Sequence, residues 1–249
     1  MNVGLYQSAS ALSALERWQD TVSQNITSSQ TTAYRGRTTN FSALAMGELQ
    51  PDASSKIGHG TGVPMLFPSS TNKVNFAPGD NQPTRRPLDF AVQGDGFFEA
   101  KLVDGSSVYT RCGDFRVGVD RVLRTSSGLE VMSSSGDSIT LAPGAGDISV
   151  RPDGTILQGT NQLGRLSVKA PADTAQLIPM AGGFFVPAEG AAMTQVEKSE
   201  VLQGYLEASN ITPLREMVDL VLISRAYEAN QKIITTIDQQ MEKTLNALG

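Results

Sequence analysis

The stretch "RAYEANQKIITTIDQQMEKTLNAL", residues 225–248, decides the fold because it predicts one uninterrupted helix at the carboxyl end of the chain. It contains neither glycine nor proline, and its Ile, Met and Leu residues recur at spacings of three and four. Upstream of it, Thr212 suits the N-cap, and Pro213 suits the first helical position, where a missing N–H costs nothing. The pattern therefore predicts a helix over residues 213–248, about 50 Å long.

The predicted carboxyl helix carries a seam in which spacings of three and four alternate, which is the heptad pattern of coiled coils. The seam consists of Leu220, Ile223, Tyr227, Asn230, Ile234, Ile237, Met241, Thr244 and Leu248. Asn230 and Thr244 interrupt it with polar side chains. The segment "MVDLVLI", residues 217–223, is apolar nearly all round, which implies burial on more than one side of the helix. Met217 and Val221 therefore join the candidates for packing.

A shorter amphipathic helix is predicted near the amino end, where neither glycine nor proline occurs between Gly4 and Gly36. Its apolar positions share one register, with Ser8 and Gln19 in the other places, and they are Leu5, Leu12, Leu15, Val22 and Ile26. The helix covers residues 5–27. Because ordering a residue costs about 1–2 kcal/mol in backbone entropy, the two helices are expected to pair. A segment that is apolar all round also needs a third surface, which is expected to come from another subunit.

The middle of the chain alternates short β-prone runs with turn dipeptides, which is typical of an antiparallel β domain. Asp104-Gly105 and Asp153-Gly154 are expected to form hairpin turns. In "LDFAVQGDGFF", residues 88–98, two glycines are expected to permit a bend before a buried strand. The candidate core and turn residues of this domain are Leu88, Asp89, Gly94, Gly96, Phe97, Phe98 and Tyr109.

The predicted fold class is α+β, with the terminal helices paired in a coiled-coil-like layer and an antiparallel β domain inserted between them. The predicted segments are the first helix and its turn over 1–36, an extended linker or β extension over 37–84, the β domain over 85–205, and the last helix over 206–249.

The composition argues against several functional classes. The 249 residues carry a net charge of −5, and no basic run exceeds Arg85-Arg86, so a nucleic-acid partner is not expected. A single cysteine, Cys112, and a single histidine, His59, exclude a disulfide framework and a multi-cysteine zinc site. No stretch approaches the roughly 18 apolar residues of a membrane helix, so membrane insertion is not expected. The amino end shows no signal peptide, so any export is expected to use a route without a cleavable signal.

No residue is expected to be catalytic or to bind a cofactor or metal. Asp89 and Asp95 could form an acid–base pair, but turn residues beside a strand are the better interpretation. His59 lies in a glycine-rich loop without a nucleophile nearby, and Cys112 is interpreted as a small strand hydrophobe rather than a reactive thiol. Trp18 is interpreted as a packing residue, and a subunit contact is one candidate place for it. The sequence shows no shielded polar cluster.

Three segments resemble the flagellar basal-body rod proteins of the proximal and distal group (the FlgF and FlgG type). They are "QNITSSQTTAYRGR" at residues 24–37, "TRRPLDFAVQGDGFFEAKLVDGSSVYTRCGDFRV" at 84–117, and "QGYLEASNITPLREMVDLVLISRAYEANQKIITTIDQQM" at 203–241. They stand in the family's order and span most of the chain. Two departures are visible: Ala33 stands where the family usually has glycine, and "GVDRVLRT" lacks the usual Asn-Gly or Asp-Gly turn.

The resemblance implies a structural subunit of the basal-body rod that crosses the periplasm, exported unfolded through the flagellar type III apparatus. Its partners would be further copies of itself and other rod subunits. The two seams would hold the inner helical layer, and Asn230 would set their register at some cost in stability. "RRPLDFAV" and the chain length favour a proximal rod subunit. The alternatives are a distal rod protein, a hook or junction protein of the wider family, and a soluble β-domain binding module or enzyme dimerised by its terminal helices.

Overall fold

The computed structural model describes residues 3–49, 63–143, 146–196 and 198–248, and the chain divides into two compact units. Unit 1 comprises residues 1–27, 37–75 and 212–249, and unit 2 comprises 28–36 and 76–211. The α+β class is confirmed, since an α-helix lies at each end of the chain and the strands pair antiparallel. None of the helices described is long and apolar enough to cross a membrane.

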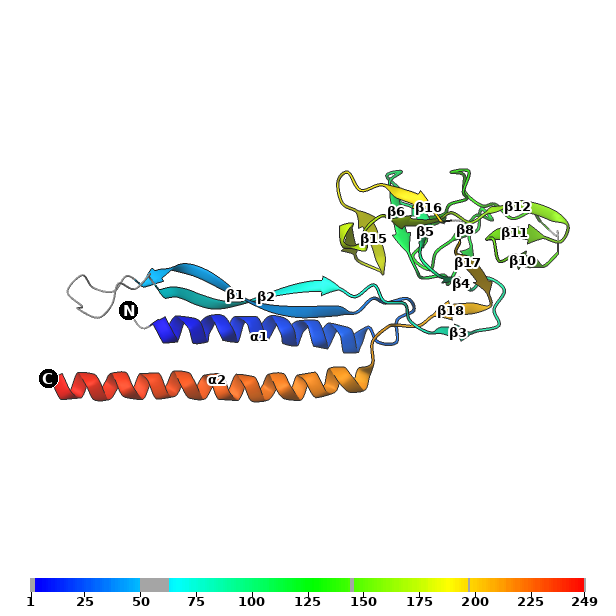
Figure 1. The fold of residues 1–249 in the computed structure, drawn as a ribbon. Helices are drawn as coiled ribbons and strands as arrows, with labels where there is room; N and C mark the ends of the chain where they lie inside the picture. The colour runs from blue at the N-terminus through cyan, green and yellow to red at the C-terminus, as the bar shows by residue number, and fades with distance from the viewer. Residues whose placement is uncertain (1–2, 50–62, 144–145, 197, 249) are drawn as a thin grey trace. The chain divides into compact units, whose positions relative to one another are not determined.

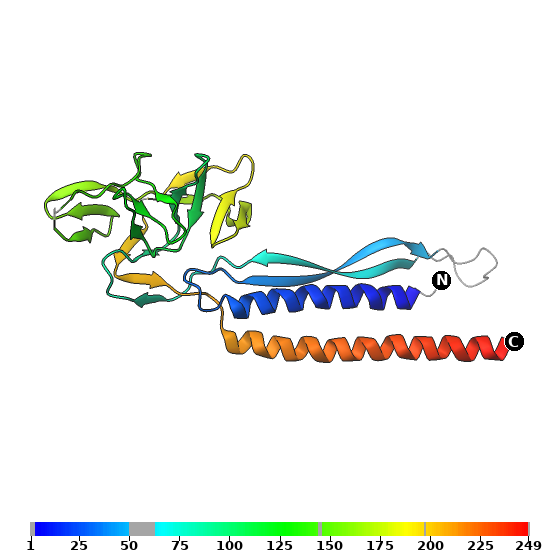
Figure 2. The same cartoon turned by 180° about the vertical axis from the view of Figure 1, so that it is seen from behind.

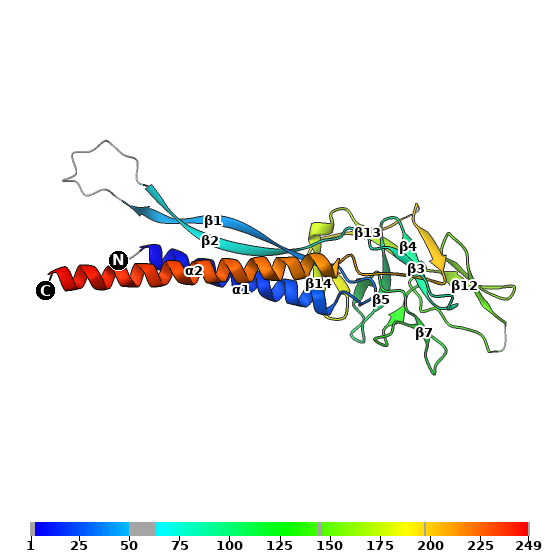
Figure 3. The same cartoon turned by 90° about the horizontal axis from the view of Figure 1, so that it is seen from below.

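Unit 1 contains both terminal helices, α1 (Val3–Thr27) and α2 (Pro213–Leu248), at nearly the predicted bounds. They lie side by side and run in opposite directions (Figures 1 and 3). Pro213 begins α2, where the fixed φ of proline suits the first helical position. The backbone N–H groups of Arg215 and Glu216 donate to the carbonyl of Thr212 at 3.0 and 3.3 Å, so the first turn of α2 closes on the predicted N-cap residue.

A long hairpin completes unit 1, formed by β1 (Arg37–Leu49) and β2 (Val63–Val74). Figure 2 shows α1 between this hairpin and α2. Side chains of α1 donate to the outer edge of β2, from Gln7 to the carbonyl of Leu66 at 3.0 Å and from Ser10 to that of Pro68 at 2.7 Å. Pro68 has no backbone N–H, so at this residue the edge of β2 offers only a carbonyl acceptor, which Ser10 satisfies. Strands β1 and β2 thus form a β extension packed on α1, whereas residues 76–84 belong to unit 2.

Unit 2 consists of short antiparallel strands and one 3-10 helix, η1 (Thr174–Gln176). The strands of its first half are β3 (Asn81–Pro83), β4 (Phe90–Gln93), β5 (Phe97–Lys101), β6 (Ser107–Thr110), β7 (Arg116–Val117), β8 (Leu123–Arg124) and β9 (Glu130–Val131). Those of its second half are β10 (Ile148–Val150), β11 (Thr155–Gln158), β12 (Asn161–Arg165), β13 (Val168–Pro171), β14 (Leu177–Met180), β15 (Phe184–Pro187), β16 (Met193–Gln195), β17 (Glu200–Gln203) and β18 (Tyr205–Glu207).

The first and last strands of unit 2 pair with each other. β3 pairs with β18, and β4 pairs with β17, whereas β5 to β9 and β13 to β16 share a nine-stranded sheet. The strands β10, β11 and β12 form a separate three-stranded sheet. The first two strands of unit 2, β3 and β4, therefore have their pairing partners in its last two strands, β18 and β17.

The core of unit 2 is built from the inward side chains of these strands. Phe115 lies at its centre, with ring centroids 5.7 Å from Phe90 and 5.2 Å from Phe98, and all three rings are buried. The remaining fully buried members of the cluster are Val92, Leu123, Val131, Ile139, Leu141, Ile156, Leu166, Val168 and Val201. Burying an aromatic or aliphatic side chain contributes about 1.5–3 kcal/mol, so this cluster supplies unit 2 with a core of its own.

The two Asp-Gly dipeptides predicted to form hairpin turns do lie in such turns. Gly105 and Gly154 have φ of 89° and 82°, and both predicted hairpins, β5–β6 and β10–β11, are confirmed. Three non-glycine residues among those described also have positive φ, with values of 56° at Ala33, 59° at Arg85 and 64° at Arg121. Ala33 and Arg121 are the two places where the sequence departs from the glycine pattern. Each pays a conformational cost that glycine avoids.

Candidate assembly site and a buried charge cluster

The predicted seam residues of α2 lie along the side that faces α1. Ile223 is 2% exposed, and Asn230 is buried as well, whereas Leu220, Tyr227, Ile234 and Ile237 are half-buried. On α1, Val22 is buried, and Leu5, Leu12, Leu15 and Ile26 are half-buried. The structure therefore brings the two predicted seams together within unit 1.

Two asparagines connect the helices at opposite ends of this contact. Asn230 Nδ2 of α2 donates to the carbonyl oxygen of Ser8 at 2.8 Å. Asn25 Nδ2 of α1 lies 3.1 Å from Glu216 Oε2 and also donates to the carbonyl of Arg37 at 2.8 Å. Both buried amides are thus hydrogen-bonded in this arrangement of α1 and α2.

The remaining candidates on α2 do not face α1. Met217 and Val221 are about half exposed, and they belong to a larger apolar face on the first turns of α2, on the side opposite the seam. This face consists of Leu214, Met217, Val218, Val221 and Leu222, with exposed fractions between 50% and 73%. The segment predicted to be buried on more than one side is thus covered on one side by its own chain and uncovered on the other.

The carboxyl end of α2 extends past the start of α1 (Figures 1 and 3). Met241, the next seam residue after Ile237, is 44% exposed there, and Leu245 is 68% exposed. The side chain of Leu248 lies outside the described residues. Among the described residues of one chain, the seam therefore has no partner beyond Ile237.

Trp18 lies on α1, where its ring packs edge-on against Phe41 of β1 at a centroid distance of 5.4 Å. The packing role predicted for Trp18 is confirmed, and its partner is the hairpin of the same chain. Phe41 remains half exposed on its other side.

The predicted core and turn residues of unit 2 lie around β4 to β6. Phe97, Phe98 and Tyr109 are buried, and Leu88 packs at the edge of the main cluster. Gly94 and Gly96 have φ of 98° and 120° on either side of the bend that precedes β5. Asp89 is fully buried, and the guanidinium of Arg86 lies 2.9 Å from its carboxylate.

Unit 2 also contains a shielded polar cluster, and the expectation of none was wrong. Glu207 of β18 lies between two arginines, with Oε1 2.6 Å from Arg35 Nη1 and Oε2 3.4 Å from Arg111 Nη1. The Glu207 and Arg35 side chains are 1% and 2% exposed. Each residue belongs to a different one of the three segments that carry the family resemblance, in "TTAYRGR", "VYTRCGDF" and "LEASN". That co-occurrence is the signal by which the sequence could have revealed the cluster.

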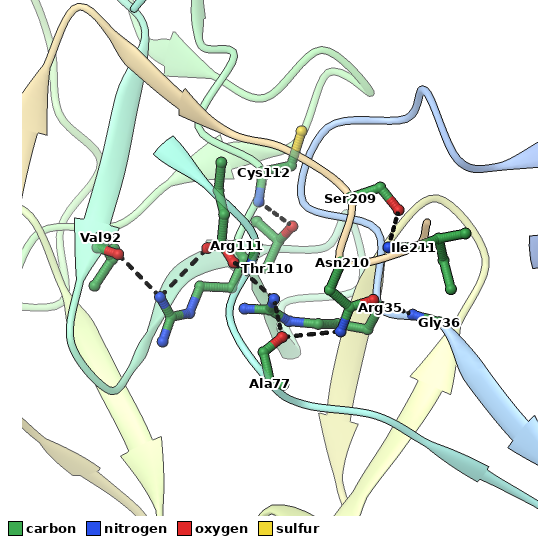
Figure 4. Close-up of polar contacts among 12 residues, drawn as sticks. Arg35, Gly36, Ala77, Val92, Thr110, Arg111, Cys112, Ser209, Asn210 and Ile211 are labelled. Atoms are coloured by element: carbon green, nitrogen blue, oxygen red, sulfur yellow. Dashed lines mark hydrogen bonds and ion pairs between the residues drawn. The ribbon is translucent and has the colours of Figure 1, made fainter. Parts of the chain in front are cut away.

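The cluster binds the main chain as well as itself (Figure 4). Arg35 Nη1 donates to the carbonyl of Ala77 at 2.7 Å, and Arg111 donates to the carbonyls of Val92 and Gly94 at 3.0 and 2.6 Å. The same three groups thus connect the segment that enters unit 2, the bend before β5 and the strand that leaves unit 2.

A main-chain N–H group also donates to the carboxylate of Glu207, and the side chain of Asn210 makes two further hydrogen bonds to neighbouring segments. Glu207 Oε1 accepts from the N–H of Gly79 at 2.9 Å. Asn210 accepts from the N–H of Gly36 at 2.8 Å and donates to the carbonyl of Ala77 at 2.8 Å (Figure 4). Segments 33–36, 77–79 and 207–210 are therefore held against one another by charged and amide groups.

Electrostatics make this cluster sensitive to the loss of any member. Desolvation lowers the pKa of Arg111, while the carboxylate of Glu207 acts to raise it. Removing one partner from a buried ion pair leaves an uncompensated charge and costs about 3–5 kcal/mol. Arg111 also stacks over the ring of Phe97 at 5.3 Å. Since Nη donors of both arginines bond to main-chain carbonyls of the same unit, the cluster acts as a structural joint.

The lone thiol is held in an unreactive state. Cys112 Sγ donates to Asp114 Oδ1 at 2.8 Å and lies 3.0 Å from Thr32 Oγ1. Burial and the Asp114 carboxylate raise the pKa of Cys112 to about 11, so little thiolate exists near neutral pH. His59 lies outside the described residues. Among those that are described, no three His, Cys, Asp or Glu side chains gather in a group that could hold a metal ion.

Two family models match this chain. The model described as flagellar basal body rod FlgEFG protein C-terminal matches residues 202–248, which include β18 and all of α2. The model described as flagellar hook protein FlgE/F/G D1 domain matches residues 91–158, which lie in unit 2.

Curated relatives match over most or all of their length. The flagellar basal-body rod protein FlgF of Caulobacter vibrioides is 28% identical over 100% of this chain and 99% of its own. FlgF of Salmonella typhimurium is 27% identical over 96% and 95%. The flagellar basal-body rod protein FlgG of Buchnera aphidicola subsp. Acyrthosiphon pisum is 30% identical over 78% of this chain and 76% of its own.

Proposed function

The chain belongs to the family of flagellar basal-body rod proteins, and we propose that it is a subunit of the rod that polymerises through α1 and α2. The observation that carries this proposal is the uncovered apolar face of α2. Its five side chains lie on the side of α2 opposite the α1 contact, so α1 cannot cover them. Because these side chains are between 50% and 73% exposed, covering them contributes on the order of 5 kcal/mol before the entropy of association is subtracted, which favours assembly.

In this proposal α1 and α2 form a coiled-coil-like layer. The alternating spacing of the seam and the paired burial of Val22 and Ile223 support it. Asn230 sets the register through its bond to Ser8, because any axial slip would leave a buried amide without a partner. Unit 2 then acts as a separately folded body with a core of its own.

The proposed location is the basal body, and the proposed partners are further copies of this chain and other rod subunits. Delivery through the flagellar type III apparatus is part of the proposal, because a rod subunit must pass out of the cell before it assembles. The family is one of structural proteins, and an enzymatic role is not proposed.

A proximal position in the rod is the favoured one. The match to FlgF of Caulobacter vibrioides, which extends over nearly the whole of both chains, supports it. The distal position is the second candidate, and a specific observation favours it too. The flagellar basal-body rod protein FlgG of Agrobacterium fabrum is also 28% identical, over 93% of this chain.

Electron microscopy of basal bodies from a strain that lacks this gene tests the proposal, with swimming scored in parallel. We expect a truncated rod without a hook, and restoration of both hook and swimming by the wild-type gene. The length of the remaining stump distinguishes the proximal from the distal position. Intact flagella that rotate in the deletion strain would refute the rod assignment.

A further inference from the structure

We propose that the apolar face at the start of α2 binds the carboxyl end of α2 from a second copy of this chain. The first surface, called the base face, consists of Leu214, Met217, Val218, Val221 and Leu222. The second, called the overhang, is residues 238–247 of α2. The inference deepens the proposed function and rests on it, because it names the two surfaces through which one subunit would meet the next.

The base face and the overhang are similar in length, and both carry exposed apolar side chains. From Leu214 to Leu222 the base face extends for about 12 Å along the helix axis, and the overhang extends for about 14 Å. Every residue of the overhang is exposed, including the apolar pair Met241 and Leu245, which are spaced by four and so lie on one stripe. Each surface therefore presents apolar side chains that its own chain leaves in water.

Charge supports the same pairing. Arg215 and Arg225 are exposed beside the base face, and Asp238 and Glu242 are exposed beside the stripe of the overhang. Within the described residues, no ion pair involves any of these four side chains. Arg215 also lies in the first turn of α2, where a cation is unfavourable and a neighbouring carboxylate would compensate it.

The occupant must be another molecule, because the two surfaces lie near opposite ends of one helix. From Val218 to Leu245 the separation along the helix axis is about 40 Å, so no chain can close the contact on itself. Base face against base face would bring arginines together, and overhang against overhang would bring carboxylates together. A head-to-tail contact leaves one surface free at each end, and such contacts propagate into an open helical assembly when the rotation between copies does not close a ring.

Disulfide cross-linking in purified basal bodies tests this pairing. The variant Val218→Cys/Leu245→Cys is made in a Cys112→Ser background, with each single-cysteine variant as its matched control. We expect the double variant to form covalent dimers and longer species under mild oxidation, whereas each single variant stays monomeric. A single variant that dimerises with itself, or one that links only to a different rod protein, would overturn the inference.

The outcomes separate this inference from the function on which it rests. If the chain is present in the basal bodies but the double variant forms no link, the head-to-tail contact is wrong and the rod assignment stands. If the wild-type chain is absent from basal bodies, both are wrong. Presence and linkage are read from the same preparation by immunoblotting.

Charge reversal gives a second readout that a failure to fold would not mimic. In the double-cysteine background, Arg215→Glu/Arg225→Glu is expected to lower the cross-linking yield about tenfold at low salt, because two attractive pairs become repulsive. Adding Asp238→Lys/Glu242→Lys to the same chain is expected to restore the yield. A yield that is unchanged by the first pair, or not restored by the second, counts against the contact.

Discussion

Arg35 and Glu207, which come from opposite ends of the sequence, meet inside unit 2 with 2.6 Å between Nη1 and Oε1. Neither side chain reaches solvent, and Arg111 shares the same carboxylate. The pair connects the segment after α1 to the segment before α2, and both connections are made within unit 2. Closing unit 2 therefore requires both its first segment, residues 28–36, and its last strand, β18, so the chain segments that enter and leave it are fixed together.

Glu207→Gln is expected to destabilise unit 2 by about 3–5 kcal/mol, because two buried arginines would lose their shared counter-charge. The measurement is the midpoint of urea unfolding followed by circular dichroism. Glu130→Gln is the matched control, since Glu130 pairs with Arg124 at 3.0 Å on the surface and its loss should cost less than about 1 kcal/mol. Equal midpoints for the two variants would show that the cluster is not the joint described.

Arg121→Gly is expected to stabilise unit 2 by about 0.5–1 kcal/mol. The residue has φ of 64° in the turn between β7 and β8, where an L side chain is strained and glycine is not, although glycine loses more entropy on folding. The control is Gly128→Ala, because Gly128 has φ of 86° with open space around it. That change should destabilise by about 1 kcal/mol, and a gain in Tm for it would contradict the argument.

Stability should fall in acid partly through Glu99. Burial acts to raise the pKa of Glu99, but hydrogen bonds from Lys169 and Ser167 outweigh it and hold the pKa below its usual 4.5. A depressed pKa in the folded state contributes stability above the usual value and loses it as the pH falls through the folded one. Wild type should therefore exceed Glu99→Gln in stability at pH 7, and the difference should narrow by pH 3. A difference that is constant with pH would rule out the proposed linkage.

Cys112 should react slowly with iodoacetamide in the folded protein. With its pKa near 11 rather than 9.0, the thiolate at pH 8 is about 100-fold less abundant than in an unperturbed cysteine. Alkylation followed by mass spectrometry should show at least that factor between native protein and protein in urea. Similar rates in the two states would mean that the thiol is open to solvent.

Much of the architecture could be predicted because its signals are local. The bounds of α2 follow from Pro213 and from a run without helix breakers, and the hairpins follow from Asp-Gly turns. For residues 37–84 the sequence allows either a linker or a β extension, because the β1–β2 hairpin is stabilised by packing on α1. Side-chain bonds from Gln7 and Ser10 to β2 provide this packing, and they connect residues that are distant in sequence.

The buried charge cluster of Arg35, Arg111 and Glu207 could not be predicted from local sequence signals either. Arg35, Arg111 and Glu207 are each ordinary charged residues in a local window, and charged residues are usually exposed. Only their positions inside three separate motifs could have indicated that they meet. The exposed base face, in contrast, was anticipated from the all-round apolar character of residues 217–223, although the sequence could not show which side of α2 its own chain would cover.

The most direct test of the central claim, that assembly proceeds through the terminal helices, is the amount of chain in basal bodies purified from cells that make Val221→Asp. Val221 is exposed in the single chain, so the variant should fold with an unchanged urea midpoint and yet be depleted from the basal bodies at least tenfold. Gln231→Asp, at an exposed polar position of the same helix, should be incorporated like wild type. Incorporation of Val221→Asp at the wild-type level would contradict the account.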